Sequence, residues 1–241
     1  MHTPLRLIDG AVFISDAHYP RHKEALLSLF DTFLSSPPPQ LFLMGDIFEF
    51  LSPYLPYTVE SNSELIEKIN SLSLLCEVVY IEGNHDFLLS SLFKNVLVCP
   101  ISAQPIKLTY GDGKVVALMH GDKYERLRYK IYANLIRRPF VLLLLRVLTF
   151  DLNGRFIKRL YEKLLQKNLC RKFDGFAQKK QNMLQKYNLS GIDTLIEGHY
   201  HQRLSIKTEG VNYESLSAFA CNKSFFKVEL KNGKINPVEL S

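Results

Sequence analysis

Three short apolar runs in the N-terminal third of the chain each end in a cluster of polar residues. The runs are AVFIS (11–15), QLFLMG (40–45) and EVVYIEG (77–83), and the clusters at their ends read SDAH, GDIFE and GNHD. Helical patterns over 22–36 and roughly 60–75 separate the runs, and a proline triplet ends the first helix. Because strand, helix, strand, helix, strand is the order of a parallel sheet covered by helices, an α/β fold is predicted.

The middle of the chain changes from sheet patterns to helix patterns. PIKLTYGDGKVVALMHGD contains a Gly-Asp-Gly turn between alternating residues, which predicts a hairpin whose second strand ends at His120. Residues 123–188 lack strand patterns and predict helices, one of them carrying the run FVLLLLRVLTF (140–150). Strand patterns then return at DTLIEG, RLSIKT, VNYESLSAF, FFKVEL and KINPVEL, the last two joined at Asn232-Gly233. They predict a mostly antiparallel finishing sheet.

The length of 241 residues suits one domain with a sizeable insertion. We therefore expect a single domain over 1–241, with 123–188 as a helical insertion. Hydrophobic residues make up 46% and charged residues 22% of the chain, which is typical of globular proteins and argues against disorder. The run at 140–150 is about half as long as a spanning helix and contains Arg146, so it is not expected to cross a bilayer.

The cysteines and the N-terminus bear on the cellular setting. Cys76, Cys99, Cys170 and Cys221 are widely scattered and form no C-x-x-C pair, so neither a zinc knuckle nor a disulfide framework is indicated. The N-terminus shows no secretory signal pattern. Both observations favour a reducing, cytoplasmic setting.

The net charge of +6 is unevenly distributed along the chain. Residues 121–190 contain 17 Lys and Arg against 5 Asp and Glu, whereas the remainder contains 13 against 19. The basic character therefore belongs to the predicted helical insertion. Solvated helix faces would explain such a segment, and so would an anionic partner.

Polar residues at the predicted strand ends combine into one candidate site. The carboxyl ends of strands in an open α/β sheet meet at one crevice, which brings distant residues together. Carboxylate, amide and imidazole groups bind divalent cations such as Mn²⁺, and a carboxylate can bridge two ions about 3.5–4 Å apart. His2 and His22 stand outside this pattern and are expected on the surface. The candidates are Asp16, His18, Asp46, Asn84, His85, Asp86, His120, His199 and His201.

The ordered series D-x-H, GD, GNHD, H and G-H-x-H resembles the calcineurin-like metallophosphoesterase family along the whole chain. The resemblance implies a four-layer α/β/β/α sandwich that holds two divalent cations, most readily Mn²⁺, with a water or hydroxide between them as the nucleophile. Carried over by position, one ion would be held by Asp16, His18, Asp46 and His201. The other would be held by Asp46, Asn84, His120 and His199.

The same resemblance implies roles beyond metal binding. His85 stands where the family places a helper for the transition state or leaving group, and Asp86 would orient it. Asn84, His85 and His199 would also contact the substrate.

Several motifs look like those of the UDP-2,3-diacylglucosamine pyrophosphatases of bacterial lipid A synthesis. They are GDIFEF, GNHDFLL, MHGD and the series Tyr129-x7-Arg137-x-Pro139 at the start of the insertion. This resemblance implies cleavage of UDP-2,3-diacylglucosamine to UMP and 2,3-diacylglucosamine 1-phosphate. The chain departs from those enzymes at His85, where they carry Arg, and at Glu125-Arg126, where they carry an acidic pair.

Under this resemblance the insertion would form a lid. The FVLLLL run would line a slot for two acyl chains, while Arg and Lys would meet the diphosphate and the anionic inner leaflet. This implies a cytoplasmic enzyme peripherally associated with the inner membrane, with an acylated nucleotide sugar as its partner and no protein partner. The alternative for the run is simple docking of the insertion on the core.

Two other functions stay open at this point. A broad phosphodiesterase or nuclease would use the basic insertion to follow a nucleic-acid backbone. Nucleic acid is the less favoured partner because the basic residues are paired with aliphatic runs. A fold used only for binding is disfavoured by the complete set of candidate ligands.

Overall fold

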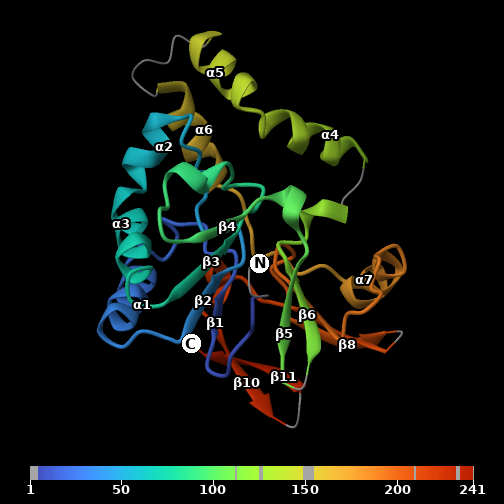
Figure 1. Ribbon diagram of the computed structural model, residues 1–241. Coiled ribbons are helices and arrows are strands. Elements are labelled where there is room, and N and C mark those ends of the chain that lie inside the picture. The colour runs from blue at the N-terminus through green and yellow to red at the C-terminus, as the bar shows by residue number, and fades with distance from the viewer. Residues whose placement is uncertain are drawn as a thin grey trace.

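Two sheets pack face to face with helices on both outer sides (Figure 1). The computed structural model describes residues 5–111, 113–124, 127–148, 155–208, 210–231 and 234–240. One sheet has six strands in the order β11-β10-β1-β2-β3-β4, and the other has five in the order β5-β6-β7-β9-β8. The four-layer α/β/β/α sandwich is thereby confirmed.

The first sheet contains the predicted β-α-β-α-β series. Its strands β1 to β4 are parallel, and the interiors of β1 and β2 are buried at every residue, as expected where both faces of a sheet are covered. The strand β4, a three-residue strand, was not predicted. The bounds are β1 Val12–Ile14, α1 Lys23–Ser35, β2 Gln40–Leu43, α2 Pro56–Ser61, α3 Ser63–Leu72, β3 Glu77–Ile81 and β4 Leu97–Cys99.

The second sheet is mixed, and it corrects the predicted finishing sheet. Strands β6, β7 and β9 are parallel, with β5 and β8 antiparallel at the two edges. The last two strands, β10 and β11, leave this sheet and pair beside β1 in the first one. The turn at 232–233 lies outside the described residues. The bounds are β5 Ile106–Tyr110, β6 Lys114–Met119, β7 Thr194–Glu197, β8 Leu204–Thr208, β9 Val211–Ser215, β10 Phe225–Lys231 and β11 Lys234–Leu240.

Side chains alternate between two cores, because successive residues of a strand point to opposite faces. On β1, Phe13 packs between the two sheets, whereas Val12 and Ile14 pack in the core that includes helix residues such as Phe30. The core between the sheets also takes Val116 from β6. This packing fixes the strands so that β1, β2, β3, β6 and β7 end near one another.

The described part of residues 123–188, which we call the helical segment, contains four helices. They are α4 Leu127–Ile136, α5 Pro139–Leu148, α6 Arg155–Leu165 and α7 Phe176–Leu184. Leu142, Ile157 and Tyr161 pack against Phe50 and Phe87 of the sandwich. Among the described helices, none combines the length and the apolar character needed to cross a membrane. The helices were predicted, and their role as a lid stays a prediction.

Helix α7 is attached to the second sheet by a buried ion pair. Lys180 on α7 pairs with Glu197, the last residue of β7, and both side chains are fully buried. The hydroxyl of Tyr187 lies 2.8 Å from Lys180 Nζ, and the hydroxyl of Tyr213 donates to Glu197 at 2.6 Å. Because Glu197 directly precedes the Gly-His-Tyr-His stretch, this pair anchors the start of that loop.

One disulfide corrects the prediction made from the cysteine spacing. Cys170, after α6, is bonded to Cys221 in the short helix α8 (Phe219–Asn222), with the Cα atoms 5.5 Å apart. Cys76 and Cys99 are free. The two bonded cysteines are separated by 51 residues, so no local spacing rule could pair them. Three short 3-10 turns complete the described elements, at Leu89–Ser91, Ile101–Ala103 and Asp122–Tyr124.

Candidate metal centre

The strand ends deliver the predicted residues to one edge of the sandwich. Asp16 follows β1, Asp46 follows β2, Asn84 follows β3, His120 follows β6 and His199 follows β7. Asp16, Asp46 and His120 are buried, and Asn84 and His199 are partly exposed. His18 and His201 lie on the same loops as Asp16 and His199.

A first group of donors consists of Asp16, His18 and His201. Asp16 Oδ1 lies 3.3 Å from His201 Nε2, and the Nε2 atoms of His18 and His201 are also 3.3 Å apart. The candidate ligand atoms of these three residues all lie within 4.8 Å of one another. This geometry suits a single bound ion.

A second group consists of Asp46, His120 and His199, with Asn84 beside it. His120 Nε2 lies 3.4 Å from Asp46 Oδ2, 3.2 Å from His199 Nδ1 and 3.2 Å from Asn84 Oδ1. Asp46 Oδ2 is also 4.0 Å from His18 Nε2. The carboxylate of Asp46 therefore stands between the two groups, where a bridging ligand would be needed.

The hydrogen bonds on the far side of two imidazoles show what the site is built to receive. His120 Nδ1 is 3.0 Å from the carbonyl oxygen of Met44, and His201 Nδ1 is 2.8 Å from that of Leu169. A carbonyl only accepts, so each Nδ1 carries a proton and each Nε2 of the neutral ring offers a lone pair. Each Nε2 faces a carboxylate oxygen, of Asp46 or Asp16, and although burial lowers the pKa of both imidazoles, these carboxylates outweigh burial and raise it. Once the rings are neutral, two acceptors face each other. Facing acceptors are the arrangement that a cation stabilises.

The charges of the site keep its carboxylates ionised. Burial by itself would raise the pKa of Asp16, but the imidazoles of His201 and His120, protonated while no cation is bound, together lower that pKa to about 2. Burial opposes ionisation of Asp46 in the same way, and His120 and His85 hold its pKa well below the usual range. Two buried carboxylates that remain charged give this edge a negative potential suited to divalent cations.

The backbone of the site is strained at the residues that supply donors. Asp16, His18, Asp46, His199 and His201 have φ angles of 50°, 47°, 51°, 69° and 56°, in the left-handed region that side chains other than glycine rarely adopt. Such conformations cost of order 1–3 kcal/mol each and persist where the surrounding structure imposes them. Their concentration at one edge marks a functional site independently of the side-chain chemistry.

Two glycines permit the close approach of these loops. Gly45 has a φ of +85°, and a Cβ there would lie 2.5 Å from His120 Nδ1. A Cβ at Gly198 would collide with Ser15 Oγ and with Asp16 Oδ2. Glycine is therefore required at both positions for the carboxylates and imidazoles to meet.

The structure gives His85 a different orienting partner from the one predicted. His85 Nδ1 lies 2.6 Å from the carbonyl oxygen of Glu49, and its backbone N–H donates to Asp46 Oδ1 at 2.8 Å. The carboxylate of Asp86 instead accepts the Tyr80 hydroxyl at 2.7 Å and the backbone N–H groups of Asp46, Ile47, Phe48 and Gly83. Asp86 thus fixes the conformation of the loop that carries Asp46, because its buried carboxylate accepts hydrogen bonds from the backbone of that loop.

Glu49 is the site residue that the sequence analysis missed. Its buried carboxylate lies 3.6 Å from His18 Nδ1, 3.9 Å from His85 Nδ1 and 2.8 Å from Arg21 Nε. His18, Glu49 and His85 form a third group of potential ligands. Arg21 already neutralises this carboxylate, so we assign Glu49 to holding the His18 ring. Glu49 is the last residue of the GDIFE cluster, so its place in that cluster could have marked it as a site residue.

A pocket next to the metal centre connects it to the helical segment. The pocket has a volume of about 210 Å³, and its lining includes Asn84 and His85 from the metal centre and Leu160, Leu164 and Lys167 from α6 and the residues after it. The FVLLLL run does not contribute to the lining. Its Leu142 packs in the core, and Phe140, Leu143 and Leu144 are exposed.

The Tyr129-x7-Arg137-x-Pro139 series also reaches the site. The ring centroids of Tyr129 and His199 are 6.4 Å apart. Arg137 Nη2 donates to the carbonyl oxygen of Gly83 at 2.9 Å and to Asp122 Oδ2 at 2.6 Å. Pro139 is the first residue of α5. The chain directly after helix α4 is thereby attached to the loop that carries Asn84.

Isolated histidines behave as expected where they are described. His22 is exposed, and its Nε2 lies 3.1 Å from the carbonyl oxygen of Ala220. His2 lies outside the described residues.

Comparisons with known proteins found relatives by sequence and by structure. A UDP-2,3-diacylglucosamine hydrolase of Blochmanniella floridana is 28% identical over 93% of this chain and 95% of its own length. One from Haemophilus influenzae (strain PittGG) is 24% identical over 82% of this chain and 85% of its own. The structure of phosphopantetheinyl hydrolase from Mycobacterium tuberculosis aligns over 95% of each chain at 12% identity, with a TM-score of 0.44.

The family model described as calcineurin-like phosphoesterase matches residues 11–203, which is most of the chain and includes every residue of the two donor groups. The predicted family is thereby confirmed. Its members use divalent metal ions, and the described residues contain clusters suited to hold them. This chain belongs to the calcineurin-like phosphoesterase family of metal-dependent hydrolases.

Proposed function

We propose that this enzyme hydrolyses the pyrophosphate bond of UDP-2,3-diacylglucosamine, producing UMP and 2,3-diacylglucosamine 1-phosphate. The observation that carries the proposal is the pocket beside the metal centre, which is polar at Asn84 and His85 and apolar at Leu160 and Leu164. A substrate with a charged diphosphate and two acyl chains has the same polarity along its length. The names of the two relatives reported above support the same substrate.

We assign the two donor groups to two divalent cations, with Mn²⁺ as the first choice because the donors mix oxygen and imidazole. Asp16, His18 and His201 would hold one ion, and Asn84, His120 and His199 the other, with Asp46 shared between them. When bound, the ions supply an acidified water and neutralise charge that develops on the phosphoryl oxygens.

The other residues of the pocket bind and orient the substrate in this proposal. Arg137 and Lys167 line the pocket and bring positive charge to the diphosphate. His85, fixed through Nδ1 on Glu49, leaves its Nε2 for an oxygen of the substrate. Leu160 and Leu164, together with Phe50 and Ile136, take the acyl chains.

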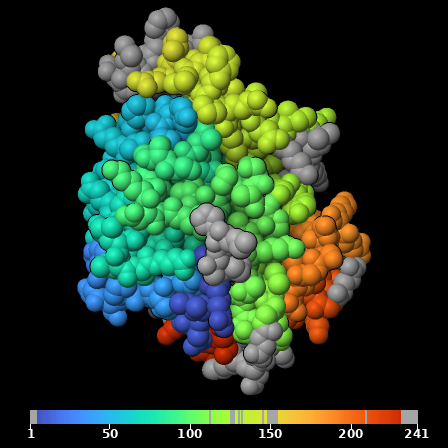
Figure 2. Space-filling model, viewed as in Figure 1, coloured from blue at the N-terminus to red at the C-terminus, as the bar shows by residue number. Residues whose placement is uncertain are grey.

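The exposed face of the helical segment supports contact with a membrane surface and a lid role. Apolar side chains are exposed on α4, α5 and α6, and α5 forms one end of the molecule in Figure 2. Arg138 and Arg155 are exposed on the same segment, as suits an anionic leaflet. The exposed apolar residues are Ile131, Leu135, Phe140, Leu143, Leu144, Val147 and Phe156.

The substrate is tested by comparing the acylated UDP sugar in detergent micelles with bis(p-nitrophenyl) phosphate, single-stranded DNA and RNA. We expect the acylated substrate to be cleaved fastest. In the variant Leu164→Asp, kcat/KM for the acylated UDP sugar should fall about 10-fold or more, because burying a leucine side chain is worth about 1.5–3 kcal/mol. Turnover of bis(p-nitrophenyl) phosphate should change less than about twofold, since that ester needs no apolar slot.

Leu74→Asp serves as the matched control, because Leu74 is 72% exposed and lies after α3, outside the pocket lining. It should leave both activities unchanged. Faster cleavage of RNA or DNA than of the acylated substrate would instead support the broad phosphodiesterase or nuclease function. If Leu164→Asp lowered kcat/KM equally for the acylated UDP sugar and for bis(p-nitrophenyl) phosphate, the acyl slot would be rejected.

A further inference from the structure

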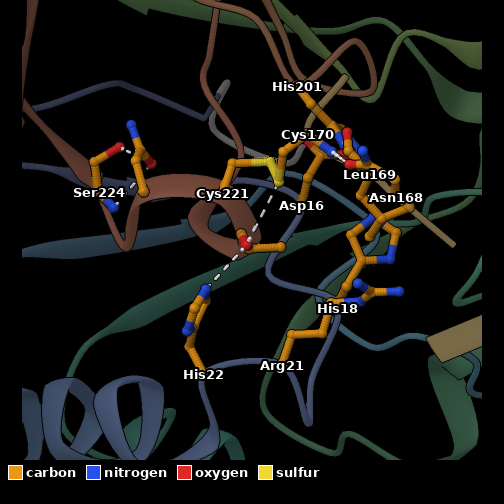
Figure 3. Close-up of a disulfide and its surroundings, with 12 residues drawn as sticks. Asp16, His18, Arg21, His22, Asn168, Leu169, Cys170, His201, Cys221 and Ser224 are labelled. Carbon is orange, nitrogen blue, oxygen red and sulfur yellow. Dashed lines mark hydrogen bonds and ion pairs between the residues drawn. A yellow bond between two sulfur atoms is a disulfide. The ribbon is translucent and has the colours of Figure 1, made fainter. Parts of the chain in front are cut away.

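The Cys170–Cys221 disulfide joins two segments that each touch the metal centre. Cys170 lies in the stretch between α6 and α7, and Cys221 lies in α8. Figure 3 shows the bond beside Asp16 and His201. Cys170 is exposed and Cys221 is partly buried.

The Cys170 side of the bond orients His201. Leu169, the residue before Cys170, accepts a hydrogen bond from His201 Nδ1 at 2.8 Å. This bond fixes the tautomer and the direction of the ring, so that Nε2 faces Asp16 Oδ1 at 3.3 Å. The position of one backbone carbonyl therefore decides how His201 meets its cation.

The Cys221 side is attached to the loop that carries Asp16. The backbone N–H groups of Phe219 and Ala220 in α8 donate to the carbonyl oxygens of Ser15 and Asp16 at 2.9 and 3.1 Å. Cys221 is the next residue of the same helix. The disulfide thus links the backbone that sets Asp16 to the backbone that sets His201.

The stretch that carries Leu169 has few regular hydrogen bonds of its own. Arg21 Nη2 donates to the carbonyl oxygens of Leu164 and Leu165 at 3.1 and 3.0 Å, which holds the end of α6. Phe173 N–H donates to Gln202 Oε1 at 3.0 Å on the other side of Leu169. Between these points the disulfide is the covalent restraint, so its loss would loosen the Leu169 carbonyl without releasing the whole stretch.

We propose that the Cys170–Cys221 disulfide holds the Leu169 carbonyl on His201 and makes cation affinity at the Asp16–His18–His201 group depend on the thiol redox state. The oxidised pair supports tight binding, and the reduced pair weakens it. This inference rests on the metal site of the proposed function and adds its regulation.

The chemistry is ordinary thiol–disulfide exchange with a dithiol reductant. One thiolate of the reductant attacks the sulfur of Cys170, the more exposed of the two residues, and expels the Cys221 thiolate, which takes up a proton. The second thiolate then displaces Cys170 from the mixed disulfide, and Cys170 takes up a proton. The protein gains two electrons and two protons, and the reductant ends as a disulfide.

The test is a Mn²⁺ titration of the metal-free protein, with free Mn²⁺ measured by electron paramagnetic resonance. The protein is compared after oxidation with glutathione disulfide and after reduction with dithiothreitol, each reagent being removed by gel filtration under argon. We expect two bound ions in the oxidised protein. On reduction the affinity for one ion should fall about 10-fold, as is typical when a partner of a ligating histidine is lost, and that for the other should stay within about twofold.

Two variants complete the test. The double variant Cys170→Ser/Cys221→Ser should bind Mn²⁺ with the affinity of the reduced protein, whichever redox treatment it receives. The double variant Cys76→Ser/Cys99→Ser should change its Mn²⁺ affinity on reduction as the unaltered protein does. Identical titrations of the unaltered protein in both redox states, or peptide mass spectra without a Cys170–Cys221 link after oxidation, would overturn the inference even if the double variant fails to fold. An oxidised protein that binds no Mn²⁺ would overturn the metal site itself.

Discussion

Asp46→Ala is expected to abolish hydrolysis of every phosphoester substrate, with a fall in kcat of at least about 1,000-fold. The carboxylate of Asp46 lies 3.4 Å from His120 Nε2 and 4.0 Å from His18 Nε2, so it belongs to both donor groups. Its removal should cost both ions their shared ligand. A catalytic metal contributes several kcal/mol to transition-state stabilisation, and about 4 kcal/mol corresponds to that loss of rate.

The measurement pairs initial rates on the acylated UDP sugar and on bis(p-nitrophenyl) phosphate with metal content by mass spectrometry. Far-UV circular dichroism shows whether Asp46→Ala keeps the fold, and Asp46→Asn repeats the test with a side chain of the same shape. Asp31→Ala is the matched control, because Asp31 is an exposed carboxylate of α1 that pairs with Lys68. Near-normal turnover in Asp46→Ala would refute the bridging assignment.

The arrangement of the site was largely predictable because its residues follow short buried strands in a fixed order. Periodicity located β1, β2, β3 and β6, and the rule that parallel strands end at one crevice then placed Asp16, Asp46, Asn84 and His120 together. His199 and His201 joined them through β7. The order of the strands alone brings their ends to one edge of the sandwich.

Other features depend on contacts between distant segments, which a local pattern does not encode. The hairpin signal correctly paired β10 with β11, but it could not show that this hairpin joins β1. The left-handed backbone at Asp46 and the other donor residues has no sequence signature outside glycine. The partner of His85 was misjudged because Asp86 is its neighbour in sequence, whereas the Glu49 carbonyl is its neighbour in space.

His85→Ala is expected to lower kcat about 100-fold while both divalent cations remain bound. His85 lines the pocket, and its ring is fixed by the Glu49 carbonyl at 2.6 Å, which leaves Nε2 for the transition state or the leaving oxygen. Positioned acid–base or electrostatic groups of this kind contribute about 10²–10⁴-fold. Its imidazole belongs to neither of the donor groups assigned to the ions, so metal content should not change. Initial rates and metal analysis on the same preparation measure both effects.

A second substitution, His85→Arg, shows whether the His85 side chain contributes to kcat by its charge or by donating a proton. The leaving group of a pyrophosphate is itself a phosphate ester, which departs as an anion and needs positive charge more than a proton. Arginine remains charged and does not donate its proton, so it should restore kcat to within about 10-fold of the unaltered enzyme if charge is the main contribution. Asp31→Ala, at the exposed carboxylate of α1 that pairs with Lys68, is again the control and should leave kcat unchanged. Loss of an ion in His85→Ala would make His85 a metal ligand, in the group it forms with His18 and Glu49.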